Sequence, residues 1–304
     1  MAGWGTFLAV AVVLTVAVLF FARASQPLLT DSGETGPGGR DAAGTDEPTT
    51  RLAVDSEPGE HGRENQPVEA ESLPTGEVAN HLAENTTSGT GTESSRPPRP
   101  DNESPGEGGL GELSTGAVLA NVAFTQGLVA AIVVGAGWYF SIPAAAFGIV
   151  GTPAVATAAG VGFGVVLWAG NELSTRAADA VGAAYDESVR QLLAPGSVGG
   201  WVSLFGAVLP LVALSEELLF RAALIGVPAA GYGLSPWLLA VVSSLAFAFA
   251  HGAQGRVGIV VTGSLGFVLA GGYILSGSLL LVVVAHYVIN AVEFLVHELL
   301  ADPR

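Results

Sequence analysis

Three charged side chains lie within an apolar stretch that runs from Trp201 to Val227. The stretch is long enough for a transmembrane helix, and its charges are Glu216, Glu217 and Arg221. A charge at the centre of a bilayer costs about 3 kcal/mol on insertion scales, so it needs a partner or a water-filled cavity. This feature restricts the chain to folds in which several helices pack around the charges.

Helical spacing predicts which of these charged residues can pair with each other. Glu217 and Arg221 are four residues apart and share a helix face, so they can form an ion pair. Glu216 lies about 100° round the helix and needs a partner from another helix. One interpretation is a structural ion cluster. The other is a functional site, because ionisable residues inside membranes usually mark such sites.

Composition places the chain in the membrane class. Half of its 304 residues are hydrophobic, and the mean hydropathy is +0.53. The absence of cysteine excludes disulfides, thiolate metal sites and cysteine nucleophiles. All 11 basic residues are arginines, and the chain has 27 acidic residues. This excess of acidic residues resembles the composition of proteins from salt-adapted organisms. We expect no nucleic-acid partner, because no basic surface is predicted.

The chain divides into three predicted parts. Residues 1–23 include 19 consecutive uncharged residues and predict a transmembrane anchor. A cleaved signal peptide is the alternative, because Ala22-Arg23-Ala24 resembles a cleavage site. Residues 24–113 hold 18 of the 27 acidic residues and few bulky apolar ones, so we expect a disordered acidic linker. Residues 114–304 are predicted to form a helical membrane bundle.

Apolar segments make this an all-α polytopic membrane protein with about seven transmembrane helices, the first being the anchor. An amphipathic helix at the membrane surface is expected over 175–195, where charges alternate with alanine and leucine. The six segments after the linker are 117–139, 154–174, 201–226, 234–251, 257–275 and 277–298.

Arginine positions predict the orientation. The loops near 140–153, 227–233 and 276 hold no lysine or arginine. We therefore expect a multi-pass protein of the cell membrane with its N-terminus outside and its linker and C-terminus in the cytoplasm. The linker would then share the cytoplasmic side with Arg23, Arg176, Arg190, Arg256 and Arg304.

Two other apolar segments carry polar groups that can partner Glu216. His251 follows Phe247 by four residues, and Asn290 follows His286 by four residues on one helix face. A lone histidine in an apolar helix is usually a packed core residue. Two of them, beside a span that carries Glu-Glu and Arg, favour a site instead. We expect Glu216, His251, His286 and Asn290 to converge on one cavity.

These side chains suit hydrolysis of a peptide bond without a covalent intermediate. A carboxylate hydrogen-bonded to histidine can act as general base on a water molecule. Histidine and an asparagine amide can donate to the oxyanion of the tetrahedral intermediate. No cofactor is favoured, but zinc is an alternative, with Glu216, His251 and His286 as ligands. The zinc motif HExxH does not occur.

Three motifs in order on successive helices, EExxxR, FxxxH and HxxxN, resemble the CPBP family of intramembrane proteases. That family includes CAAX proteases and bacteriocin-processing (Abi) proteins, and the resemblance covers about residues 200–298. It implies an intramembrane endopeptidase that cuts a membrane-anchored protein or peptide. The implied roles are Glu216 and His251 as water-activating groups, His286 and Asn290 as oxyanion donors, and Glu217 and Arg221 as a supporting pair.

Other interpretations stay open. The resemblance also implies that a catalytically silent scaffold or immunity protein is an alternative, and buried Glu, Arg and His also occur in transporters and proton relays. Metallopeptidase chemistry is a further alternative to the glutamate mechanism. Glu172 is interpreted as an interfacial residue. Glu293 and His297 are expected to snorkel at the interface, with a place at a substrate entrance as the alternative.

Overall fold

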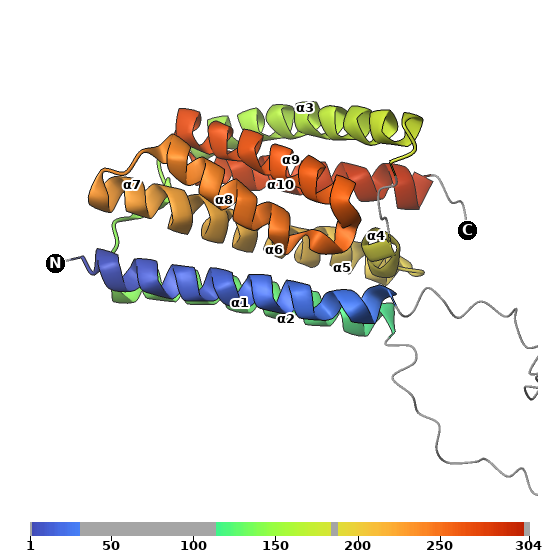
Figure 1. The fold of residues 1–304 in the computed structure, drawn as a ribbon, viewed down its shortest axis with the longest axis horizontal. Coiled ribbons are helices and arrows are strands. Elements are labelled where there is room, and N and C mark those ends of the chain that lie inside the picture. Colours follow the sequence, from blue (N-terminus) through green and yellow to red (C-terminus); the bar gives the residue numbers. More distant parts are fainter. Residues whose placement is uncertain (1, 31–113, 184–187, 301–304) are drawn as a thin grey trace, which may run out of the picture. The chain divides into compact units, whose positions relative to one another are not determined.

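The computed structural model describes residues 2–30, 114–183 and 188–300, which belong to one compact unit. Every regular element in this part of the chain is a helix (Figure 1). The elements are α1 (Trp4–Thr30), α2 (Thr115–Tyr139), η2 (Ala144–Phe147), α3 (Pro153–Ala180), α4 (Ser188–Leu193), α5 (Val198–Ser203), η3 (Leu204–Val208), α6 (Leu209–Glu217), η4 (Leu218–Gly226), α7 (Val227–Tyr232), α8 (Pro236–Ala250), η5 (Gly252–Gln254), α9 (Gly255–Ser276), α10 (Leu279–Phe294) and η6 (Leu295–Leu300).

Serine residues are the N-caps of several of these helices. Ser114 accepts from the backbone N–H of Ala117, and Ser278 accepts from that of Leu281. Such caps satisfy donors that have no partner inside the helix, which matters most where water is scarce. Gly277 follows α9 in a left-handed conformation, so the chain can reverse within two residues and start α10.

One continuous helical segment, Val198–Tyr232, forms the middle of the bundle and carries the charged motif. Two of its stretches, η3 and η4, are π-helical, and η4 begins directly after Glu217. Such wide turns occur frequently at functional sites. Nearly all of η4, including Arg221, is buried, and so is Glu217 at the end of α6, so this pair lies inside the protein rather than against lipid.

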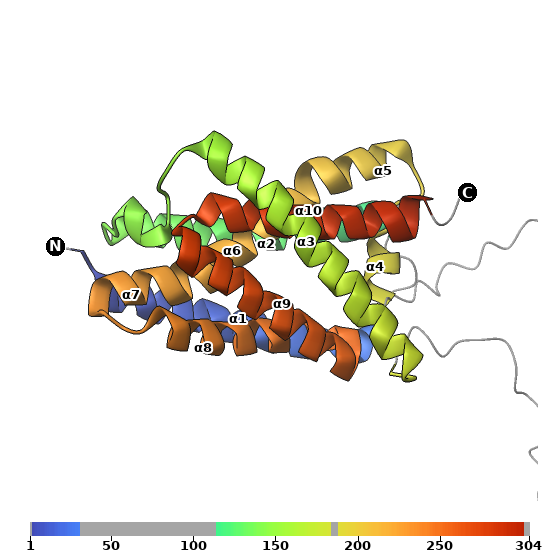
Figure 2. The same cartoon turned by 90° about the horizontal axis from the view of Figure 1, so that it is seen from above.

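Helix α3 crosses α10 at close range, as seen from above in Figure 2. Gly160 and Gly164 make this approach feasible, because an added Cβ would lie 2.6 Å from the carbonyl oxygen of Leu281 or 2.7 Å from that of Ala285. Small residues at helix crossings are typical of membrane bundles. The crossing holds α10, which carries the last motif, against the rest of the bundle.

The first helix is part of the bundle. Phe7 and Ala11 of α1 are buried in the main apolar core. The Phe7 ring meets Phe147 of η2 edge to face, with centroids 5.5 Å apart. Helix α1 also contacts α8, η4 and η5. It therefore packs against the segments that carry the second and first motifs, which an anchor outside the core would not do.

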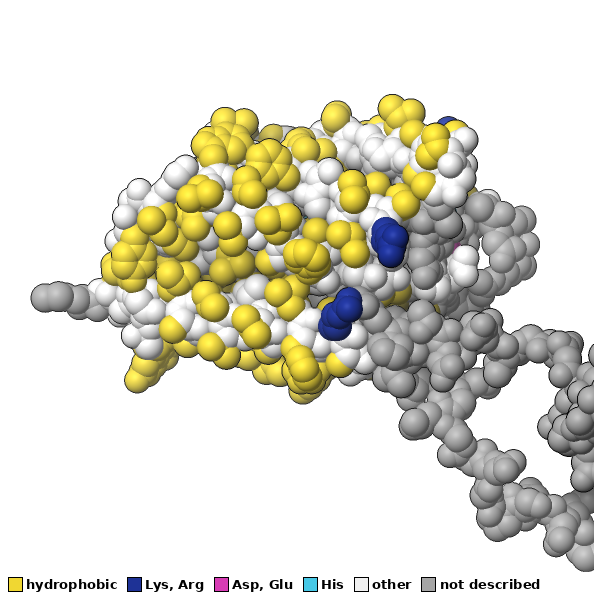
Figure 3. Space-filling view, viewed as in Figure 1, with side chains coloured by type: hydrophobic (Ala, Val, Ile, Leu, Met, Phe, Trp, Pro, Cys, Tyr) yellow, Lys and Arg dark blue, Asp and Glu magenta, His cyan; other side chains and the backbone are white. Residues whose placement is uncertain are grey.

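The surface agrees with a membrane protein. Many large hydrophobic side chains are exposed, among them Phe124, Val166 and Leu238. Figure 3 shows hydrophobic side chains spread over the whole visible face of the described helices, with the visible Lys and Arg confined to one end. Such a surface suits lipid rather than water. The protein is a multi-pass membrane protein.

The helix count in the described residues roughly fits the predicted number of about seven. Within the described residues six helices are long and apolar enough to cross a membrane, and α8 has only 15 residues. At 1.5 Å per residue, α8 is about 22 Å long, shorter than a hydrocarbon core of about 30 Å. It ends early because the chain turns at His251 and enters η5.

Two boundaries also differ from the prediction. Helix α1 continues to Thr30, past the predicted boundary at residue 23, and the rest of the predicted linker lies outside the described residues. The predicted surface helix over 175–195 is wrong, since α3 extends through its first part to Ala180 and α4 covers only Ser188–Leu193. Glu172 and Arg176 pair at i and i+4 in this part of α3, which favours its helical conformation.

Candidate active site

The predicted pair of Glu217 and Arg221 is present and almost fully enclosed. Oε1 of Glu217 lies 3.0 Å from Nη1 of Arg221, and the two side chains are 0% and 1% exposed. Arg221 also donates from Nη2 to the carbonyl oxygen of Gly266 at 3.0 Å, and its guanidinium lies 4.6 Å above the ring of Phe247. Buried charges persist only with such compensation. Arg221 thus joins η4 to α8 and α9.

Glu217 also holds a histidine from another helix. Nδ1 of His286 on α10 lies 2.8 Å from Oε1 of Glu217. An ionised carboxylate paired with arginine accepts hydrogen bonds, so Nδ1 of His286 carries the proton. Nε2 is then an acceptor in the neutral ring and a donor only in the imidazolium. Glu217 therefore determines which ring nitrogen faces the cavity and how it can act.

Glu216 lies between two histidines at distances too long for direct hydrogen bonds. Its Oε2 is 3.7 Å from Nε2 of His286 and 3.9 Å from Nε2 of His251. This oxygen is buried and has no hydrogen-bond partner among the described residues. Polar atoms at this separation can share a bridging water or a substrate atom. The carboxylate is therefore placed to act on a third group rather than on the histidines themselves.

His251 is oriented by its own motif. Its Nδ1 lies 2.8 Å from the backbone carbonyl oxygen of Phe247, one turn earlier in α8. A carbonyl can only accept, so Nδ1 donates, and Nε2 of the neutral ring presents a lone pair toward Glu216. Phe247 thus has two roles, because its ring covers Arg221 while its carbonyl orients His251.

All four expected side chains line one cavity. The cavity has a volume of about 340 Å³ and contains Glu216 from α6, His251 after α8, and His286 and Asn290 from α10 among its lining residues. Glu217 and Arg221 are not in the lining and lie behind it. The convergence expected from helical spacing is therefore found in the structure, whereas the catalytic roles remain predictions. Apolar side chains such as Val212 and Leu269 make up much of the remaining wall.

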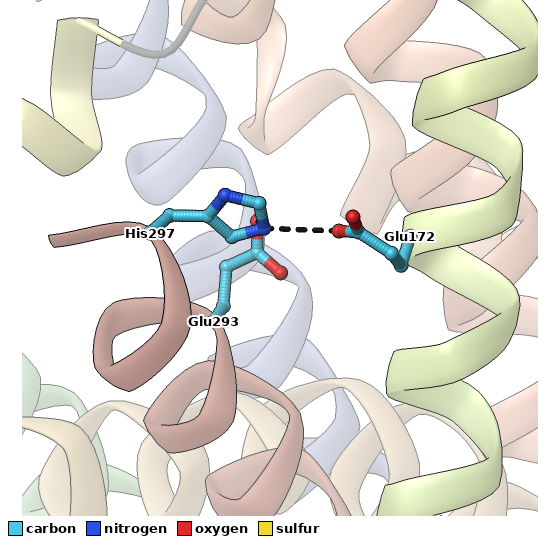
Figure 4. Close-up of side chains that lie close together, drawn as sticks. All are labelled: Glu172, Glu293 and His297. Carbon is cyan, nitrogen blue, oxygen red and sulfur yellow. Dashed lines mark hydrogen bonds and ion pairs between the residues drawn. The ribbon is translucent and has the colours of Figure 1, made fainter. Parts of the chain in front are cut away.

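A second charged cluster lies partly in the lining of this cavity. Glu293 and Arg190 belong to the lining, and their side chains pair at 2.8 Å. His297 reaches Glu172 of α3 at 2.9 Å and lies 3.7 Å from Glu293. Figure 4 shows these three side chains pointing toward one another, Glu172 from α3, Glu293 from the C-terminal end of α10 and His297 from η6.

This cluster corrects the expectation of snorkelling at Glu293 and His297. Both side chains point into a network between helices, because Glu172 and Arg190 offer partners there. Ligand atoms of Glu172, Glu293 and His297 lie within 4.8 Å of one another. Arg176 already pairs with Glu172, as Arg190 does with Glu293, so we interpret the group as an ion-pair network and assign no metal to it.

Sequence reasoning overlooked several polar residues of the cavity, among them Gln126, Asn171 and Thr262. Gln126 of α2 lines it, and Oε1 of Gln126 accepts from the hydroxyl of Ser215, next to Glu216. The sequence did hold a signal for Gln126, because it lies in the middle of an apolar span. An unpaired amide is costly there, so a glutamine at that position indicates a polar partner. Gln254, which also lines the cavity, accepts from the hydroxyl of Thr262 at 2.6 Å.

Comparison with known proteins finds a family match in the C-terminal part of the chain. Residues 198–292, about a third of the chain, match the family model described as type II CAAX prenyl endopeptidase Rce1-like. The match is consistent with a CPBP family intramembrane protease. Searches of the curated proteins and of the solved structures found no match.

Proposed function

We propose a glutamate-dependent peptide hydrolysis at the cavity, because the match of residues 198–292 to the Rce1-like model supports intramembrane endopeptidase activity. In this proposal Glu216 and His251 activate water, while His286 and Asn290 stabilise the oxyanion. Glu217 and Arg221 support the site without touching the substrate. The substrate is a membrane-anchored protein or peptide.

The observation that carries the proposal is the position of Glu216 relative to the two rings. Its Oε2 faces Nε2 of both His251 and His286 across gaps of 3.9 and 3.7 Å. A water held in such a gap can lose a proton to Glu216 or His251 as its oxygen attacks the peptide carbonyl. The same group can return the proton to the leaving amine, which completes the hydrolysis.

The oxyanion must be stabilised from α10. Asn290 lies one turn beyond His286 on the same cavity wall, and its amide can donate in any protonation state of the site. His286 can donate from Nε2 only as an imidazolium, because Nδ1 is engaged by Glu217. Asn290 is therefore the first oxyanion donor in this proposal and His286 the second.

A zinc ion does not suit these side chains as they are placed. Tetrahedral zinc brings ligand atoms to about 3.4 Å from one another. Among the described residues only the Glu172 cluster has three ligand atoms within 4.8 Å of one another, and Glu216, His251 and His286 do not meet that spacing. This supports a hydrolysis in which the side chains themselves activate the water, and we derive no step through a metal.

The orientation completes the proposal. The cavity end formed by Arg190 and Glu293 lies near the C-terminal end of α10, where the visible arginines also gather in Figure 3. We propose that this end faces the cytoplasm, since arginines are retained on that side. The substrate would then be cut near the cytoplasmic face. A prenylated CaaX tail is the first candidate, because the matching family is described by that substrate.

The test compares membrane proteins from cells with the wild-type chain and from cells with Glu216→Gln. Glutamine keeps the shape of the side chain but cannot take a proton. We expect one or a few membrane proteins to accumulate uncut in the variant. Glu112→Gln, in the acidic linker, is the matched control and should leave the cleavage pattern unchanged. Identical patterns for wild type and Glu216→Gln would overturn the proposal.

A further inference from the structure

Gln126 is a polar residue of the cavity that none of the motifs includes. It lies on α2, in a helix without charged residues and outside the matched segment 198–292. Its half-buried side chain lines the same cavity as Glu216. A polar side chain at that depth needs hydrogen bonds, so its contacts indicate its role.

The oxygen of the Gln126 amide already accepts a hydrogen bond, whereas its nitrogen can still donate. Ser215 donates its hydroxyl to Oε1 of Gln126 at 2.5 Å. Among the described residues, Oε1 is the only atom of the Gln126 amide with a hydrogen bond, and the amide nitrogen is not among the fully buried atoms that lack a partner. Ser215 therefore engages the amide oxygen and leaves the two N–H donors of this cavity-lining residue available.

A peptide that enters this cavity brings main-chain carbonyls that need donors. Much of the wall is apolar and includes Val122 and Val212, which lie about one turn before Gln126 and Ser215 on their own helices. An unpaired carbonyl in such surroundings costs about 1–3 kcal/mol. Asn290 is already assigned to the reacting carbonyl, so a neighbouring carbonyl of the peptide requires another donor.

We infer that Gln126 is a substrate-binding residue, whose amide N–H groups donate to a main-chain carbonyl of the peptide beside the bond that is cut. The inference rests on the proposed function and adds a contact from a helix outside the family match. Because the contact is made in both the bound state and the transition state, it affects binding of the substrate rather than the rate of chemistry.

The test measures kcat and KM of the purified full chain on a fluorescent farnesylated peptide that ends in a CaaX sequence. We expect Gln126→Leu to raise KM about 5–10-fold and to keep kcat within about 2-fold of wild type. This is the effect of losing one hydrogen bond that is equally strong in the bound state and in the transition state. Ser215 keeps an acceptor in this variant, since the carbonyl oxygen of Val212 lies 3.1 Å from its hydroxyl. Leucine therefore leaves no new unpaired group in α6.

Two further variants separate substrate binding from helix packing. Ser215→Ala breaks the same bond between α2 and α6 but keeps the amide, so its KM should rise less than that of Gln126→Leu. Thr125→Val, an exposed neighbour on α2, should leave both constants unchanged. Equal losses and equally lowered melting temperatures for Gln126→Leu and Ser215→Ala would show a structural role and overturn the inference.

The outcomes also separate this inference from the proposed function. Cleavage by wild type and none by Glu216→Gln would support the proposed function. With that result in hand, an unchanged KM for Gln126→Leu, or a fall in kcat alone, would overturn only the role of Gln126. Equal cleavage by wild type and Glu216→Gln, or none by either, would overturn the proposed function and this inference with it.

Discussion

Glu217 and His286 meet through a hydrogen bond of 2.8 Å between Oε1 and Nδ1. The same carboxylate oxygen pairs with Arg221 on the next turn. One buried oxygen thus links the charge that stabilises η4 to the histidine that faces Glu216 in the cavity. Stability of the bundle and orientation of the site depend on the same side chain.

Replacing Glu217 should therefore affect both properties. Glu217→Gln keeps the size of the side chain but leaves Arg221 buried without its counter-charge, which typically costs about 3–5 kcal/mol. We expect a clearly lower melting temperature in detergent, together with loss of peptide cleavage. The double variant Glu217→Met with Arg221→Met should recover much of the stability and none of the activity, because His286 still lacks its partner. A double variant with wild-type activity would contradict the link between pair and site.

Asn290 tests the oxyanion role. Asn290→Ala and Asn290→Asp should both lower kcat by about 10²–10³, since removal of one oxyanion donor has that effect in other hydrolases and aspartate adds repulsion. The measurement is single-turnover cleavage of the peptide probe. Asn121→Ala, an exposed asparagine of α2 outside the cavity lining, serves as control. Full activity of the aspartate variant would exclude the role and favour a metal ligand or a structural contact.

Chelation distinguishes the two ways of activating water. Under the glutamate mechanism, exhaustive treatment with a zinc chelator should leave the cleavage rate unchanged, because Glu216 and His251 supply the base. A zinc site would lose activity under the same treatment and regain it with added zinc, since the bound metal would make the water nucleophilic. The metal content of the purified chain is measured in the same samples as the cleavage rate. The comparison shows whether the amount of bound metal correlates with activity.

The first helix should be required for stability. Phe7 of α1 is 1% exposed and packs against Phe147, so Phe7→Ala should cost about 3–5 kcal/mol by leaving a cavity. Phe20, on the same helix, is 67% exposed, and Phe20→Ala should change stability little. Melting temperatures in detergent check both values. Similar melting temperatures for the two variants would mean that α1 is only an anchor.

The sequence alone determined the features that depend on helical periodicity. Apolar segments predicted a helical membrane bundle, and the four-residue spacing of Glu217 and Arg221 predicted their ion pair. The same spacing placed His286 and Asn290 on one face of α10. Such features are local, because residues four apart on a helix lie close together whatever the rest of the chain does.

Only the tertiary structure decided which helices supply the partners. It showed that Glu217, rather than Glu216, holds His286, that Gln126 of α2 joins the cavity, and that Glu172 draws His297 away from the interface. It also packed α1 into the core and shortened α8 at His251. These contacts join residues far apart in the chain, and their geometry depends on how close helices approach, as at Gly160 and Gly164, which no periodicity within a single helix encodes.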